Sequence, residues 1–169
     1  MNSPWRQALA VMLLALSVAA PAGLFVTAAR AADEASAGEP LQRFPRTTAT
    51  VRTAHGTHAF RTWVANTQER RAQGLMYLRQ LDADQAMYFP LGPPQWASFW
   101  MKNTYVSLDL LFIAADGRVV NIAERATPLS LEPIPASAPV VAVLEVVAGT
   151  AARLGIAPGD RVVLARPGH

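Results

Sequence analysis

The sequence predicts a β-rich α+β fold, either a small curled sheet or a barrel-like domain, with two short helices. About seven short segments show the alternating or continuous apolar pattern that is typical of strands. The segments between them are too short for the long helix that follows each strand of a parallel doubly wound sheet. About 120 residues remain after an expected N-terminal leader, which is enough for one hydrophobic core and too few for two.

The N-terminal segment, residues 1–32, has the three-part layout of a secretory signal peptide. Arg6 supplies a positive charge, Ala8–Ala20 is an apolar stretch, and small residues follow, so we expect cleavage near Ala31 or Ala32. An uncleaved membrane anchor is the alternative, although a proline and a glycine interrupt a continuous helix there. The alanine- and arginine-rich usage is typical of a bacterium, so export would place the protein in the periplasm or outside the cell.

Residues 33–45 are polar and without period, which predicts a flexible leader, and residues 46–167 would form a single folded domain. Loss of Arg6 and Arg30 with the signal segment leaves 13 of the 15 basic residues against 12 acidic ones. The chain also has no basic run, so we expect no nucleic-acid partner, and we expect membrane contact only through the signal segment. The absence of cysteine excludes thiol nucleophiles and thiolate metal sites.

A β-hairpin is expected at the start of the folded part. Thr47–Thr53 and Ala59–Ala65 both alternate apolar and polar residues, and Gly56 between them suits the positive φ of a tight turn. The period then changes in the sequence NTQERRAQGLM, which predicts a short helix.

The start of this helix can be capped by Asn66 or Thr67, and Gly74 can end it. Ala72 and Leu75 would form its inward face.

The remaining elements are short strands, one loop and a second helix. Ala86–Leu91 is expected to be a buried strand that Pro90 ends, and ASFWM a further short strand. Four prolines between Thr127 and Pro139 predict a loop. The other expected elements are a hairpin of Leu108–Ala114 and Val119–Ala123 around Asp116–Gly117, a strand at Val140–Val147, a helix at Gly149–Leu154 and a final strand at Arg161–Ala165.

The segment SFWMKNTYVSLDLLFI is the main candidate site, because polar side chains stand there among aromatic and apolar ones. Asp109 lies inside an apolar strand, and a buried carboxylate has to be paired. We expect it either to be held by the Asn103–Thr104 turn, by Lys102 or by an arginine, or to bind a ligand or act as a general base. The expected ligand-binding residues are Trp100, Met101, Lys102, Asn103, Thr104 and Asp109, with Asp109 and Lys102 as catalytic candidates.

Lys102 is the single lysine of the chain. It is a candidate nucleophile or charge-stabilising group, and its simpler interpretation is a solvated turn lysine. For Asn103 and Thr104 we favour turn chemistry, because Asn tolerates left-handed φ and both side chains bond to local backbone.

Other candidate groups give weaker signals. Glu124 and Glu145 have the residue type of a hydrolytic carboxylate pair, but we expect them to be single exposed or arginine-paired residues. His55 and His58 flank a turn without a nearby acid, so we predict no metal site, and no cofactor is expected. The methionines Met76, Met87 and Met101 are expected to fill the core, with copper(I) binding as the alternative.

Four segments in order resemble the blocks of a bacterial and archaeal family, the domain of unknown function 192. They are VANTQERRAQGLMYLRQL, FWMKNTYVSLDLLFI, DGRVVNIAE and VLEVVAGTAARLGIAPGDRV, and the likeness spans about Val51 to Val163. The resemblance implies a compact, barrel-like β-rich fold and no established activity. Ser107 stands where the family has proline, and Ala86 where it has glycine.

The leading functional hypothesis is an exported β-rich domain that binds a small molecule or an envelope component. Its site would lie where WMKNT meets Asp109, near the proline-rich loop Thr127–Pro139. The alternative is a hydrolase of a cell-envelope substrate, with Asp109 as the base and Lys102 stabilising charge. The sequence does not decide whether the protein is an enzyme.

Overall fold

The computed structural model describes residues 39–165. The expected signal segment and the first part of the expected leader, residues 33–38, lie outside the described residues. Within residues 39–165, none of the helices has the length and apolarity needed to cross a membrane.

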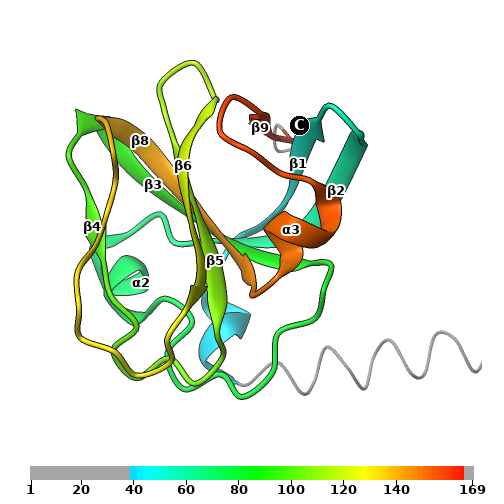
Figure 1. The fold of residues 1–169 in the computed structure, drawn as a ribbon. Helices are drawn as coiled ribbons and strands as arrows, with labels where there is room; N and C mark the ends of the chain where they lie inside the picture. Colours follow the sequence, from blue (N-terminus) through cyan, green and yellow to red (C-terminus); the bar gives the residue numbers. More distant parts are fainter. Residues whose placement is uncertain (1–38, 166–169) are drawn as a thin grey trace, which may run out of the picture. The chain divides into compact units, whose positions relative to one another are not determined.

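The domain is built on a seven-stranded sheet with the order β6-β5-β8-β3-β2-β1-β9 (Figure 1). Neighbouring strands are antiparallel except β2 and β3, and two further strands, β4 and β7, form a small separate sheet. The elements are η1 (Glu39–Arg43), β1 (Arg46–Thr53), β2 (Gly56–Val64), α2 (Gln68–Gln73), β3 (Gln85–Gln95), β4 (Ser98–Phe99), β5 (Leu108–Ile113), β6 (Val119–Ala126), β7 (Ile134–Pro135), β8 (Val140–Val147), α3 (Thr150–Leu154) and β9 (Arg161–Leu164).

The sheet curls until its two edge strands meet at one end. The amide of Val119, the first residue of β6, donates to the carbonyl of Asp160 before β9 at 2.8 Å, and Val162 donates to Gly117 at 2.8 Å. A β-bridge between Arg118 and Arg161 joins the same two edges. The predicted β-rich fold with a curled sheet and two short helices is therefore confirmed.

Both faces of the central strands are buried, so the sheet separates two clusters of apolar side chains. Every residue of β5 is buried, and alternation sends Leu108, Leu110 and Phe112 to one face and Leu111 and Ile113 to the other. We call the first group, with Leu41, Phe44, Trp63, Leu75, Met87, Phe89, Met101 and Val143, the α2-side cluster. The second group, with Val51, Phe60, Leu144, Val146, Ala151 and Ile156, is the α3-side cluster.

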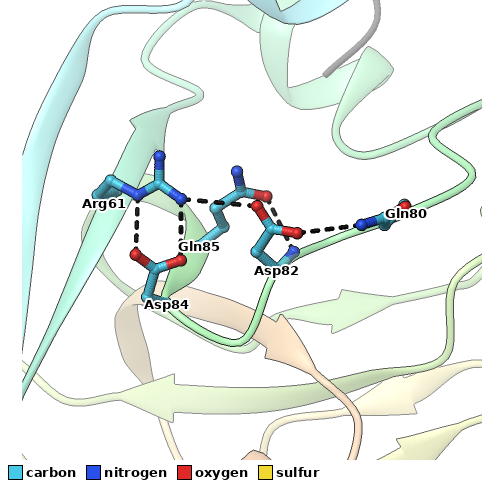
Figure 2. A network of polar contacts seen from close by, with 5 residues as sticks. All are labelled: Arg61, Gln80, Asp82, Asp84 and Gln85. Carbon is cyan, nitrogen blue, oxygen red and sulfur yellow. Dashed lines mark hydrogen bonds and ion pairs between the residues drawn. The ribbon is translucent and has the colours of Figure 1, made fainter. Parts of the chain in front are cut away.

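The single parallel pair, β2 and β3, starts at a polar network on the surface (Figure 2). The Arg61 guanidinium donates to both Asp84 oxygens at 2.9 Å and lies 3.6 Å from Asp82. The side-chain oxygen of Gln85 accepts from the Asp82 amide at 2.9 Å. Because Arg61 and Asp84 are partly exposed, we assign the network to fixing the strand register, with at most about 1 kcal/mol of stability.

Three local expectations are corrected. Residues 39–45 are not a flexible leader, since they include η1 and bury Leu41 and Phe44 in the α2-side cluster. Ala72 is exposed, because α2 buries none of its residues and the inward contact comes from Leu75 after the helix. Pro90 does not end its strand: past Tyr88, β3 pairs with β8 alone, so a missing amide is tolerated there.

Gly117 is the turn residue on which the meeting of the two edges depends. Its φ is +83°, and a Cβ there would lie 3.0 Å from the Val162 carbonyl oxygen. We expect Gly117→Ala to lower the free energy of unfolding by about 1–2 kcal/mol more than Gly92→Ala. Gly92 is the matched control, since its φ is +92° and a Cβ there would have no other atom within 4 Å. Urea unfolding of both variants measures the difference, and equal losses would contradict this account.

Candidate functional site

The turn Trp100–Thr104 follows β4 and reverses direction at Asn103, whose φ is +54°. The proline-rich loop lies against it, because the Met101 amide donates to the Ser130 carbonyl at 3.0 Å. A second bond, from the Leu129 amide to the Thr104 carbonyl, measures 3.1 Å. The expected proximity of this turn to the loop is therefore present in the structure.

Asn103 joins this turn to the one that follows α2. Its carbonyl accepts from the Tyr77 amide at 2.8 Å, and its side-chain amide donates to the Tyr77 hydroxyl at 2.9 Å. Tyr77 also has a positive φ, +66°. Two turns with left-handed residues are thus held together by hydrogen bonds. The positive φ of Asn103 is the conformation that Asn tolerates in turns.

A small pocket of about 50 Å³ lies between the end of α2, this turn and β8. We call it the acid pocket, because Glu145 of β8 is part of its lining. Its lining also includes Arg71, Gln73, Met76, Trp100, Lys102 and Thr104.

Glu145 is buried, with 5% of its surface exposed. Its partners across the sheet are Leu110 on β5 and Met87 on β3, and both are fully buried. Desolvation raises the pKa of Glu145 to about 8, so the carboxyl is mostly protonated near neutral pH. Among residues 39–165 no hydrogen bond or ion pair reaches this carboxyl. The expectation of an exposed or arginine-paired Glu145 was wrong.

Gln73 is a second polar group of the acid pocket without a partner. Its Nε2 is buried and makes no hydrogen bond to any residue of the described chain. Buried polar groups in folded proteins are nearly always hydrogen-bonded to protein or to ordered water, so a water molecule or a ligand in the pocket is the expected partner of these two groups.

An apolar groove of about 550 Å³ adjoins the acid pocket and shares Arg71, Phe89, Phe99 and Trp100 with it. Its far side is formed by Leu131 and Pro133 of the proline-rich loop. Two of its wall residues pack on each other, since the Phe99 ring lies edge-on against Phe89 at 5.2 Å between centroids.

Two large apolar side chains of the groove face solvent. Trp100 is 54% exposed and Leu131 is 65% exposed. Lys102 is also exposed, and its Nζ lies 5.5 Å from the centroid of the Trp100 ring. The single lysine thus stands beside the aromatic wall that the groove and the acid pocket share.

Asp109 lies on the opposite side of the sheet from this site. Alternation along β5 places it with Leu111 and Ile113, whereas Met101 and Leu110 belong to the α2-side cluster. The structure therefore brings Trp100, Lys102 and Thr104 together around the acid pocket and leaves Asp109 apart from them. Met101 is core, and Asn103 is a turn residue.

The carboxylate of Asp109 is fully buried and accepts three backbone hydrogen bonds. Oδ1 accepts from the amides of Arg125 at 2.8 Å and Gly149 at 3.1 Å, and Oδ2 accepts from Ala151 at 2.9 Å. Its partners are therefore backbone amides of the end of β6 and the first turn of α3, and not the Asn103–Thr104 turn, Lys102 or an arginine side chain, which were the expected partners.

The other candidates occupy separate places. His58 Nε2 is buried without a partner in the described chain, and the ring of His55 packs against Gly155. Residues 39–165 hold no group of three His, Cys, Asp or Glu side chains that fits a metal ion. Met87 and Met101 are fully buried in the α2-side cluster, and the Met76 sulfur accepts a hydrogen bond from the side-chain amide of Asn103 at 3.8 Å.

Fold and site together define a small β-rich domain with an apolar groove beside a pocket that a buried carboxyl lines. Residues 49–164 match the family of the domain of unknown function 192 (DUF192), which is described as an uncharacterized ACR, and the chain belongs to this family. None of the curated proteins matches the chain.

Two crystal structures share the fold. A protein of unknown function from Novosphingobium aromaticivorans DSM 12444 is 43% identical, with a TM-score of 0.72 over 74% of this chain and 89% of that one. A protein from Sinorhizobium meliloti 1021, described as a candidate transcription regulator, is also 43% identical. Its TM-score is 0.69, over 72% of this chain and 95% of that one.

Asp109 is expected to be essential for stability. Asp109→Ala leaves three backbone amides without their acceptor, one of them buried, so we expect it to lower the free energy of unfolding by about 3–5 kcal/mol. Glu132→Ala, at an exposed position of the proline-rich loop, serves as the control and should change it by less than about 0.5 kcal/mol. Denaturant unfolding tests both, and a loss below about 1 kcal/mol for Asp109→Ala would refute the bracing role.

Glu145 is expected to make stability depend on pH. The unfolded chain releases this proton near pH 4.5 and the folded chain near pH 8, so the free energy of unfolding should fall as pH rises between these values. The full difference is about 5 kcal/mol. Glu145→Gln should flatten this part of the curve, whereas Glu124→Gln, at an exposed site on β6, should not. Parallel slopes for wild type and Glu145→Gln would show that Glu145 ionises normally.

Proposed function

We propose that this DUF192 protein is an exported binding module for a small molecule. Export is proposed from the signal-like layout of residues 1–32, and the binding site from the groove together with the acid pocket. The observation that carries the proposal is a concave, mostly apolar surface of about 550 Å³ that ends at unpartnered polar groups. This combination of size, lining and few convergent polar groups is typical of small-molecule sites.

The groove residues support binding in two further ways. Exposed Trp100 and Leu131 leave apolar surface in water, and a ligand between them would remove it. The walls also need little ordering, since Phe99 is held by Phe89 and the Trp100–Thr104 turn by backbone bonds to the loop.

The hydrolase hypothesis has less support. It needs Asp109 and Lys102 beside one pocket, but the Asp109 oxygens are already used by three amides on the other side of the sheet. A base must reach the proton it removes, and a fully buried carboxylate does not. The description of the Sinorhizobium protein as a candidate transcription regulator applies to that protein, and the near-balanced charge of this chain does not favour nucleic acid.

Thermal-shift screening of apolar and amphipathic small molecules tests the proposal. We expect hits that raise the melting temperature of the wild type by a few degrees, through the linkage of binding to folding. Trp100→Ala should abolish these shifts. Trp96→Ala is the matched control, because Trp96 is 70% exposed and does not line the groove.

Two outcomes would contradict the proposal. One is a broad screen without any stabilising compound. The other is a set of hits that Trp100→Ala leaves unchanged, because such compounds bind elsewhere on the protein.

A further inference from the structure

We propose that the groove and the acid pocket bind a free amphipathic carboxylic acid, with its apolar body in the groove and its carboxylate beside Gln73 and Glu145. The inference rests on the proposed function, because it names the ligand class of the same site.

The two volumes fit the two parts of such a ligand. A cavity needs about 10–15 Å³ to hold one water molecule, so a pocket of about 50 Å³ has room for a small polar group such as a carboxylate. The adjoining groove of about 550 Å³ lies within the usual range for small molecules. Phe89, Phe99 and Trp100 line both spaces, so the two are neighbours, and the proposal places one ligand across them.

The polar groups of the acid pocket are mostly donors. Gln73 lines the pocket, and its Nε2, which carries two N–H groups, has no acceptor in the described chain, so a rotation of the side-chain amide would direct a donor into the pocket. The Glu145 carboxyl retains its proton near neutral pH because burial raises its pKa to about 8, so it presents an O–H. A ligand carboxylate offers several lone pairs to these donors, and an O–H bond to an anionic oxygen is among the strong hydrogen bonds of proteins.

The charges around the acid pocket also favour an anion. Its charged and titratable lining groups are Arg71, Lys102 and Glu145. With Glu145 protonated, the remaining two are cations, and both are exposed. A cationic ligand would meet like charges there, whereas an alcohol would gain no charge interaction.

The pH dependence of binding follows from the same groups. The ligand carboxylate is ionised above about pH 5, and Glu145 loses its proton near pH 8. Between these two pH values the ligand carboxylate is an anion and the Glu145 carboxyl is neutral. Above pH 8 two carboxylates would share the pocket, and their repulsion should weaken binding.

The test compares decanoate, 1-decanol and decylamine, which share one apolar chain and differ in the end group. Titration followed by tryptophan fluorescence or calorimetry at about pH 6.5 should show decanoate binding about ten-fold or more tightly than the other two. At about pH 9.5 decanoate should bind the wild type about ten-fold less tightly than at pH 6.5. Glu145→Gln keeps a donor and cannot ionise, so its affinity should stay constant over this range.

Lys102→Ala provides a second readout that does not depend on a core substitution. It changes an exposed side chain, so the fold should persist, as circular dichroism can verify. We expect it to lower the affinity for decanoate several-fold, by about the amount that an exposed charge contributes, and to leave the affinity for 1-decanol unchanged. Trp96→Ala again serves as the control variant.

The possible failures separate the two proposals. Equal affinity for the three probes, or preference for decylamine, overturns the carboxylate inference and leaves the groove as a ligand site. Failure of decanoate to bind also overturns it. If the thermal-shift screen gives no groove ligand either, the proposed function falls as well. If neither Lys102→Ala nor a change of pH alters the affinity for decanoate, the ligand is held by apolar contacts alone. That result also overturns the carboxylate inference.

Discussion

The carboxylate of Asp109 is the interaction on which the arrangement of the second half of the chain depends. It lies in a fully buried strand and accepts from amides of the β6 end and of the first turn of α3. A desolvated charge is unfavourable by several kcal/mol unless hydrogen-bond donors surround it. The carboxylate therefore fixes the end of β6 and the start of α3 next to β5. The left-handed Arg125 and the register shift between Leu108 and Leu110 are the local adjustments that aim an amide at the carboxylate.

The two-sided burial of the sheet divides its buried carboxyl groups into separate roles. Asp109 faces the α3-side cluster and is fully hydrogen-bonded, whereas Glu145 faces the α2 side and is not. The two strands that carry them are neighbours, with Leu110 paired to Glu145 and Asp109 paired to Val146. Asp109 and Glu145 are thus one residue out of register across the β5–β8 ladder and point to opposite faces of the sheet. Asp109 stabilises the fold, whereas Glu145 lies beside a pocket.

Much of the fold could be predicted from alternation and turn residues, because the period of two and the residues Gly56 and Gly74 have direct local causes. The partners of Asp109 could not, because backbone amides about 40 residues away leave no signature in side-chain type. Glu145 carried a usable signal. It stands alone in the run VVAVLEVV, as Asp109 does in LDLLFI, and the same argument about a charge inside an apolar strand applied to both. The proximity of Trp100 to the proline-rich loop was expected, but the whole groove was not, because α2, β3 and β4, which lie far from that loop in the sequence, form the rest of its lining.

The helix α3 has only five residues, and its N-cap is a glycine that offers no side-chain acceptor. Helices this short do not persist alone in water, because nucleation is costly and few internal bonds repay it. The acceptor for the Ala151 amide in its first turn is instead Oδ2 of Asp109 on β5, far away along the chain. Helical order at α3 should therefore be a late event in folding, conditional on the β5–β8 ladder, and amide protons there should exchange no slower than those of the strands that hold them.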